Sequence, residues 1–206
     1  MRDELTMELN IEEMALLFKA LQFAAQKHQH QRRKNETAVP YINHLIAVAD
    51  ILWEIGHVYE MPTIIAGILH DTLEDTETTP AELEAAFGAV ICGIVQEVTD
   101  DKRLPKQERK RLQIEHAQTS SRPARHVKLA DKICNVQDIA SAPPAGWSWQ
   151  RRVEYVDWAE NVVRGLRGVN PPLERHFDLI CAHARQILGV RPEHGASFSF
   201  GGVLFR

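Results

Sequence analysis

Four side chains that could bind a metal ion stand out in the sequence: His44, the adjacent pair His70 and Asp71, and Asp131. The pair lies inside a predicted apolar helix that runs through IIAGILHD, where an aspartate without a partner is costly. Imidazole nitrogens and carboxylate oxygens together form a mixed site that suits Mn²⁺, Fe²⁺ or Zn²⁺. The alternative is that His70 and Asp71 hydrogen-bond to each other or to helix ends, and a His-Asp dipeptide alone leaves both interpretations open.

Two further carboxylates follow this pair at helical spacing. Glu74 lies four residues after His70 and three after Asp71, and Asp75 lies four residues after Asp71. Residues with these separations share a helix face. A carboxylate one turn from a metal ligand can orient a water molecule or accept its proton during attack on a phosphate ester. The spacing therefore favours hydrolytic metal chemistry, with the order of action of the two carboxylates left open.

Basic and amide side chains near these segments could contact phosphates. Arg33 and Lys34 belong to the run RRK, and an arginine offers a two-pronged donor to phosphate oxygens, although a solvated basic run is the plainer interpretation. Asn135 lies four residues after Asp131 and could present its amide to a substrate or to a water molecule. The segment 100–113 carries six basic residues from Lys102 to Arg111. It could help to attract a polyphosphate, but a solvated helix face is the plainer interpretation.

These residues fall in blocks that resemble the HD-domain superfamily of metal-dependent phosphohydrolases. More closely, the chain is similar to the small alarmone hydrolases, which are stand-alone relatives of the hydrolase half of RelA/SpoT enzymes. The blocks follow one another in the family's order over roughly residues 14–188. They are RRKNETAVPYINH (32–44), AGILHDTLEDT (66–76), FGAVICGIVQEVTDDKRLPKQERKRLQ (87–113), VKLADKICNV (127–136), GWS (146–148) and EYVDWAENVVRGLRG (154–168).

The resemblance implies an all-α fold, an HD-domain bundle of about eight to ten helices. It implies removal of the 3′-pyrophosphate from guanosine tetra- or pentaphosphate (ppGpp or pppGpp), which yields GDP or GTP and pyrophosphate. It also implies site roles: Mn²⁺ held by His44, His70, Asp71 and Asp131; catalysis by Glu74 and Asp75; and substrate binding by Arg33, Lys34, Asn135 and Tyr155. The chain departs from the family at Leu45, where a proline is frequent, and in the loop 35–39.

Two other functions remain open at this stage. The same metal site could serve an NADPH 2′-phosphatase or another nucleotide phosphohydrolase, because each substrate presents a ribose phosphate near a purine. A nucleotide sensor that binds without turnover is a third possibility, which the adjacent Glu74 and Asp75 disfavour.

Helical periodicity runs through most of the chain, and we expect residues 1–189 to form one domain. The tail, 190–206, lacks this period and is expected to be flexible. Pro62 and Pro80 suit the first turns of helices, and Phe87-Gly88 is expected to end a short helix. The expected helices include a first one bearing Met14 to His28 on its apolar face, another bearing Leu45 to Ile55, and others over 89–98, 106–118, 123–140, 148–167 and 171–188.

Composition narrows the functional class. The 206 residues carry a formal net charge of −4, which disfavours a general nucleic-acid binder. No apolar run approaches the roughly 20 residues of a membrane span, so we expect no membrane partner. The acidic N-terminus and three scattered cysteines favour a cytoplasmic protein. We expect a guanosine polyphosphate as the substrate and no fused synthetase domain after residue 206.

Overall fold

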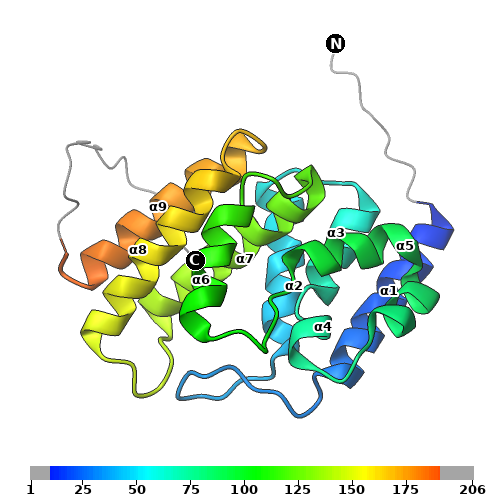
Figure 1. Cartoon of the computed structure of the whole chain (residues 1–206), viewed down its shortest axis with the longest axis horizontal. Coiled ribbons are helices and arrows are strands. Elements are labelled where there is room, and N and C mark those ends of the chain that lie inside the picture. The colour runs from blue at the N-terminus through cyan, green and yellow to red at the C-terminus, as the bar shows by residue number, and fades with distance from the viewer. Residues whose placement is uncertain (1–9, 191–206) are drawn as a thin grey trace.

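The computed structural model describes residues 10–190, and it is all-α (Figure 1). Within these residues the only β-type pairings are two isolated bridges, Arg32 with Pro40 and Asn35 with Pro144. The expected tail from residue 191 onward lies outside the described residues. The helices are α1 (Ile11–Lys27), α2 (Ile42–Asp50), the π-helical turn η1 (Ile51–Ile55), α3 (Met61–Leu69), α4 (Thr72–Asp75), α5 (Pro80–Val98), α6 (Lys106–His116), α7 (Arg122–Ser141), α8 (Trp149–Leu166) and α9 (Pro171–Ile187).

Side-chain caps fix where several helices begin. Thr79 accepts a hydrogen bond from the backbone of Glu82 at the start of α5, and Pro80 occupies the first turn. Asn170 caps α9 through Leu173, and its amide also donates to the carbonyl of Gly56 at 2.8 Å. This second bond ties the start of α9 to the turn that follows η1.

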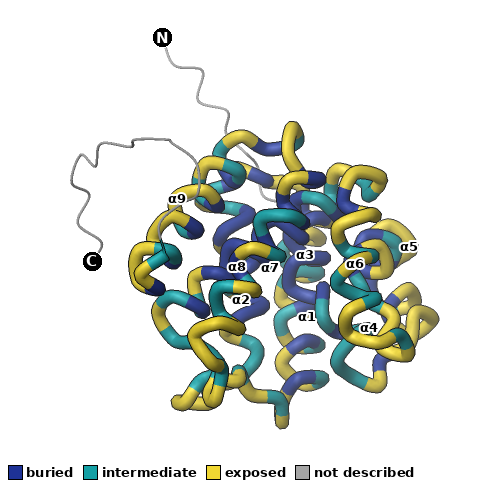
Figure 2. Tube along the Cα trace, turned by 60° about the vertical axis from the view of Figure 1, so that its left-hand side comes forward, coloured by how far each residue is buried: buried dark blue, intermediate teal, exposed yellow. Residues whose placement is uncertain are grey.

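Helix α3 is the centre of the core, because its residues are buried on almost every side (Figure 2). It packs against α1, α2, α5 and α7. A Cβ atom on Gly67 would lie 2.8 Å from the Cδ1 atom of Leu52, so a larger residue there would force the buried Leu52 side chain to shift. The fully apolar character of this helix in the sequence reflects this central position.

Two boundaries in the core region differ from or refine the expected elements. The residues of α5 form one continuous span, but Gly88 breaks it with a φ of 83°, as the expected stop at Phe87-Gly88 requires. The sequence suggested that His70 and Asp71 lie inside an apolar helix, and this prediction was wrong. Helix α3 ends at Leu69, and Asp71, with φ −94° and ψ 0°, turns the chain into the single turn α4.

This turn places polar side chains at the edge of the core, where they need not be buried within a helix packed on all sides.

In the part of the chain that is described, no helix is both long enough and apolar enough to cross a membrane.

Candidate functional site

Three helices bring the predicted metal ligands together. His44 projects from α2, His70 and Asp71 follow α3, and Asp131 lies on α7. The Nε2 atom of His44 is 3.2 Å from Asp131 Oδ1, and the Nε2 atom of His70 is 3.0 Å from Asp71 Oδ2. The cross distances are 3.8 Å from His44 to Asp71 and 3.6 Å from His70 to Asp131. His44, His70 and Asp131 offer ligand atoms within 4.8 Å of one another.

His70 is arranged as a metal-binding histidine usually is. The Nδ1 atom of His70 lies 2.8 Å from the carbonyl of Gly67, so Nδ1 carries the hydrogen and Nε2 presents its lone pair. The Nε2 atoms of His44 and His70 are buried, and neither has a hydrogen-bond partner of good geometry among the described residues. A buried lone pair without a partner is costly, and a divalent cation between the nitrogens and the carboxylates would satisfy both. The donor set therefore fits a metal ion.

Outer side chains hold these carboxylates in place. Tyr41 donates its hydroxyl hydrogen to Asp71 Oδ2 at 2.6 Å. Lys132 donates to Asp131 Oδ2 at 2.9 Å, and although burial disfavours its charge, the Asp131 carboxylate raises the pKa of Lys132 above its ordinary value. Neither Tyr41 nor Lys132 was predicted from the sequence. The role of Tyr41 depends on the fold, which brings Asp71 opposite it, whereas Lys132 directly follows Asp131, a separation that gives no helix-face signal.

Glu74 and Asp75 form the floor of a large cavity beside this cluster. Burial raises the pKa of Glu74 to about 7, with further contributions from the negative charges of Asp71 and Asp100. Glu74 accepts a hydrogen bond from the backbone of Asp100 at 3.2 Å. A carboxyl group with a pKa near neutrality is suited to exchanging protons during a reaction.

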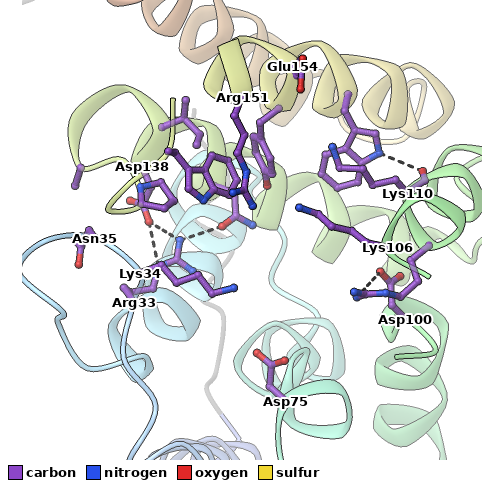
Figure 3. A pocket seen from close by; sticks show the side chains of 18 of the residues that line it. Arg33, Lys34, Asn35, Asp75, Asp100, Lys106, Lys110, Asp138, Arg151 and Glu154 are labelled. Atoms are coloured by element: carbon purple, nitrogen blue, oxygen red, sulfur yellow. Dashed lines mark hydrogen bonds and ion pairs between the residues drawn. The ribbon is translucent and has the colours of Figure 1, made fainter. Parts of the chain in front are cut away.

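The cavity has a volume of about 990 Å³ and lies between α4, α6, α7, α8 and the loops 28–41 and 142–148 (Figure 3). Positively charged side chains line the cavity on several sides: Lys34 from the first loop, Lys106 and Lys110 from α6, and Arg151 from α8. In Figure 3 the side chains of Lys34, Lys106 and Arg151 point into the same space. None of the ion pairs between described residues involves any of these four cations.

The cations of the cavity repel one another. Partial burial lowers the pKa of Lys106, and the positive charges of Arg151, Lys34 and Arg109 lower it further. Burial and then the charge of Lys106 do the same to Lys110. Because the mutual repulsion of these cations costs free energy when no ligand is bound, it indicates a site built to receive an anion with several charges. Helix α6 is thus more than the solvated face expected from the sequence, since Lys106, Arg109 and Lys110 line the cavity.

Aromatic rings cover the wall of the cavity that α8 provides. Tyr155 lies between Trp147 and Trp158, with ring centroids 5.7 Å and 5.3 Å away. The guanidinium of Arg151 lies 4.1 Å from the Trp147 centroid, and Lys110 Nζ lies 4.7 Å from that of Trp158. Flat apolar surfaces beside cations can accommodate a nucleobase next to its phosphates.

Arg33 and Asn135 line the cavity, but both are held by protein partners. Arg33 donates to Asn135 Oδ1 at 3.0 Å and forms an ion pair with Asp138. Asn135 in turn donates to Asp131 Oδ1 at 2.5 Å. The structure thus places Arg33, Asn135, Lys34 and Tyr155 in one cavity, with Lys34 exposed and Arg33 tied down.

Several cavity residues were not named as site residues from the sequence, although the basic run that contains Lys106 and Lys110 was considered as a polyphosphate-attracting segment. Asp138 anchors Arg33, and Lys106, Lys110 and Arg151 supply the cations described above. Gln31 contacts Asp75. Arg151 lies in the first turn of α8. Lys106 and Lys110 left a signal in the sequence, because they are four residues apart on one face of α6. That signal could not be distinguished from an ordinary solvated face.

Comparison with known proteins settles the family. The model of the HD domain matches residues 20–156. The chain belongs to the HD-domain family. Within this family, it is 51% identical over 166 residues to guanosine-3′,5′-bis(diphosphate) 3′-pyrophosphohydrolase MESH1 of Danio rerio, covering 81% of this chain and 92% of that protein. It is 52% identical to the protein of the same name from Homo sapiens, over 79% of this chain and 90% of the human protein.

A solved structure supports the same placement. A metazoan orthologue of SpoT, described as hydrolysing ppGpp, matches with a TM-score of 0.79 and 47% identity, over 81% of this chain and 93% of the other. The HD-domain chain described here is therefore a relative of the MESH1 proteins over most of their length. The resemblance to small alarmone hydrolases is confirmed.

Proposed function

We propose that this HD-domain protein hydrolyses guanosine tetra- and pentaphosphate to GDP or GTP and pyrophosphate. The observation that carries the proposal is the juxtaposition of two sites. A buried cluster of two histidines and two aspartates adjoins a cavity of about 990 Å³ whose cations crowd one another. The activity for which the MESH1 relatives and the SpoT orthologue are named supports the same reaction.

The proposed cofactor is Mn²⁺, held by His44, His70, Asp71 and Asp131. The two imidazole nitrogens without hydrogen-bond partners and the two carboxylates make a donor set of the mixed kind that Mn²⁺ accepts. When bound, such a cation neutralises phosphate charge and lowers the pKa of water from about 15.7 toward 7.

Glu74 and Asp75 are the proposed catalytic residues. Both line the cavity next to the cluster, and the pKa of Glu74 is raised to about 7. We assign them to orienting the attacking water and accepting its proton. The raised pKa favours Glu74 as the group that holds the proton.

The proposed substrate contacts are of two kinds, cations that bind the phosphates and an aromatic ring that contacts the nucleoside. Lys34, together with Lys106, Lys110 and Arg151, would bind the phosphates, and Tyr155 would contact the base or ribose. Arg33 and Asn135 are placed so that each contributes to the wall while fixing its neighbours. A substrate with four or five phosphates matches a cavity with at least four converging cations.

The test is a turnover comparison on protein reconstituted with Mn²⁺. We expect release of pyrophosphate from ppGpp, with GDP as the nucleotide product. NADPH serves as the second substrate, and release of inorganic phosphate from it at equal or higher kcat/KM would instead support a 2′-phosphatase. Binding of both nucleotides without turnover would support a sensor.

A further inference from the structure

Asp75 is held by a side chain that the proposed function does not use. Gln31, in the loop after α1, donates from Nε2 to Asp75 Oδ2 at 2.7 Å. The other oxygen of Asp75, Oδ1, pairs with Lys102, whose side chain is 48% exposed. An exposed pair is easily exchanged for water or for a ligand, whereas the contact with Gln31 is partly buried. Gln31 is therefore the fixed support of this carboxylate.

A second contact fixes Gln31 itself. The Oε1 atom of Gln31 lies 2.5 Å from His28 Nδ1. Since the Asp75 carboxylate can only accept, the amide nitrogen of Gln31 must face it, and Oε1 must face His28. His28 therefore carries its hydrogen on Nδ1 and donates to Gln31. The three side chains form one directed chain of hydrogen bonds, from His28 through Gln31 to Asp75.

The backbone around this chain leaves Gln31 little freedom. The backbone N–H of Gln31 donates to the backbone carbonyl of His28 at 2.9 Å, and the backbone carbonyl of Gln31 accepts from the backbone N–H of Tyr41 at 3.1 Å. His28 is 2% exposed at the end of α1, and its ring stacks on Tyr41 with centroids 5.3 Å apart. Burial and stacking fix the ring, and the ring fixes the amide.

We propose that His28 and Gln31 are positioning residues, which orient the carboxylate of Asp75 for the hydrolytic step. This inference rests on the proposed function, because it assigns Asp75 a role in turnover. His28 falls on the apolar stripe of α1 and could be explained as a core histidine. A residue needed only for packing, however, would not need to donate a hydrogen bond to Gln31, which in turn donates to the catalytic carboxylate of Asp75.

The first test replaces Gln31 by Met, which has a similar length and no hydrogen-bonding amide. Loss of a bond to a charged acceptor should lower kcat on ppGpp by roughly 10- to 100-fold. We expect KM within about twofold of wild type and unchanged Mn²⁺ content, because a support for the reacting geometry acts on kcat. An unchanged kcat would overturn the proposal.

A double-mutant cycle separates positioning from general damage. In an Asp75→Asn background the carboxylate is already absent, so Gln31→Met should lower kcat by less than about threefold. If Gln31→Met lowers kcat equally in both backgrounds, Gln31 does not act through Asp75 and the proposal fails. A crystal structure of the Gln31→Met variant gives a readout without turnover, and we expect the Asp75 side chain to change rotamer.

A matched pair of variants tests His28. Asn and Leu have nearly the same shape, and both remove the ring that stacks on Tyr41, but Asn keeps a nitrogen donor at the position of Nδ1. We expect His28→Asn to retain several-fold more kcat than His28→Leu, and equal values would remove His28 from the chain. Wild-type protein without activity on ppGpp would contradict the proposed function, whereas active wild type with unaffected variants would contradict only the positioning role.

Discussion

The two sides of the site are built in opposite ways. On the metal side, His44 and His70 are 5% exposed, and their partners come from helices that pack in the core. On the substrate side, Lys34 and Arg151 are exposed, and they stand on a loop and on the first turn of α8. The metal side satisfies its polar groups internally except at two nitrogens. The substrate side keeps several cations without ion-pair partners among the described residues.

This difference shows which part of the chemistry each side can supply. A buried, supported cluster holds charge in a fixed place, which suits a step that must always happen at the same atom. An open, mutually repelling set of cations binds an anion through summed charge, which tolerates changes of detail in the ligand. We therefore expect substitutions on the metal side to abolish turnover, and those on the substrate side to reduce it in proportion to the ligand's charge.

The largest effect should follow from His70→Ala, which removes one ligand from the buried side. We expect loss of bound Mn²⁺ and a decrease in kcat of about 10³-fold or more, because the charge stabilisation supplied by a metal is worth several kcal/mol. Elemental analysis and turnover on ppGpp measure both quantities. The exposed His183→Ala is the control, and metal retention by His70→Ala would disprove the ligand assignment.

The next effect separates chemistry from metal binding within the buried side. Glu74→Gln and Asp75→Asn should each retain metal and lose roughly 10²- to 10⁴-fold in kcat. A raised pKa means that Glu74 binds its proton up to a higher pH than usual. Because a bound cation lowers this pKa, kcat/KM of the Mn²⁺-loaded wild type should rise with pH and level off at or below about pH 7. Full activity in both variants would contradict their catalytic role.

On the open side, Lys34→Ala should lower kcat/KM for ppGpp by about 10- to 100-fold and leave the metal content unchanged. The loss should be smaller on a substrate with a single phosphate, because fewer charges remain to be held. Arg111→Ala is the matched control, since Arg111 lies on α6 outside the cavity and pairs with Glu108 and Glu115. Equal losses on both substrates would mean that Lys34 supports its loop.

The smallest effect is on stability. Because burial raises the pKa of Glu74 from its ordinary value of 4.5 to about 7, the metal-free protein loses stability as the pH rises between these two values, and the loss is complete above about pH 7. Metal-free Glu74→Gln should therefore unfold at a temperature a few degrees above metal-free wild type at pH 8, for a gain of about 1 kcal/mol or more. The difference should shrink as the pH falls below 7 and vanish below about pH 4, where wild-type Glu74 is protonated in both folded and unfolded states. Calorimetry of both proteins across this pH range measures it.

Much of the fold could be predicted from the sequence because its signals are local. The bounds expected for α7, α8 and α9 lie within about two residues of the observed ones. Capping residues and a proline in the first turn carried the prediction for the start of α5 and for α9, and a glycine stop carried it for the end of α9. The turn at His70 and Asp71 was missed. Apolar periodicity continues up to this pair, and nothing local shows that the chain leaves the helix there.

The site was predictable to the extent that its residues follow one another at helical spacing. Glu74 and Asp75 met this condition with His70 and Asp71. Tyr41 did not, because a hydrogen bond between distant segments leaves no periodic signal. Lys132 did not either, because it directly follows its partner Asp131 and adjacent residues do not share a helix face. The basic residues of α6 were visible, but whether such a face meets solvent or a cavity depends on α8, which lies across from it.

The placement of Asp131 on α7 has a consequence for how the protein is made. His44, His70 and Asp71 emerge from the ribosome well before Asp131, and α7 must close a long loop onto α2 and α3 before the four side chains meet. A nascent chain that ends before α7 has two imidazoles and one carboxylate of the cluster, and no fourth donor. The cluster thus forms only after α7 has packed against α2 and α3, and capture of a metal ion marks a chain that has reached this stage of folding.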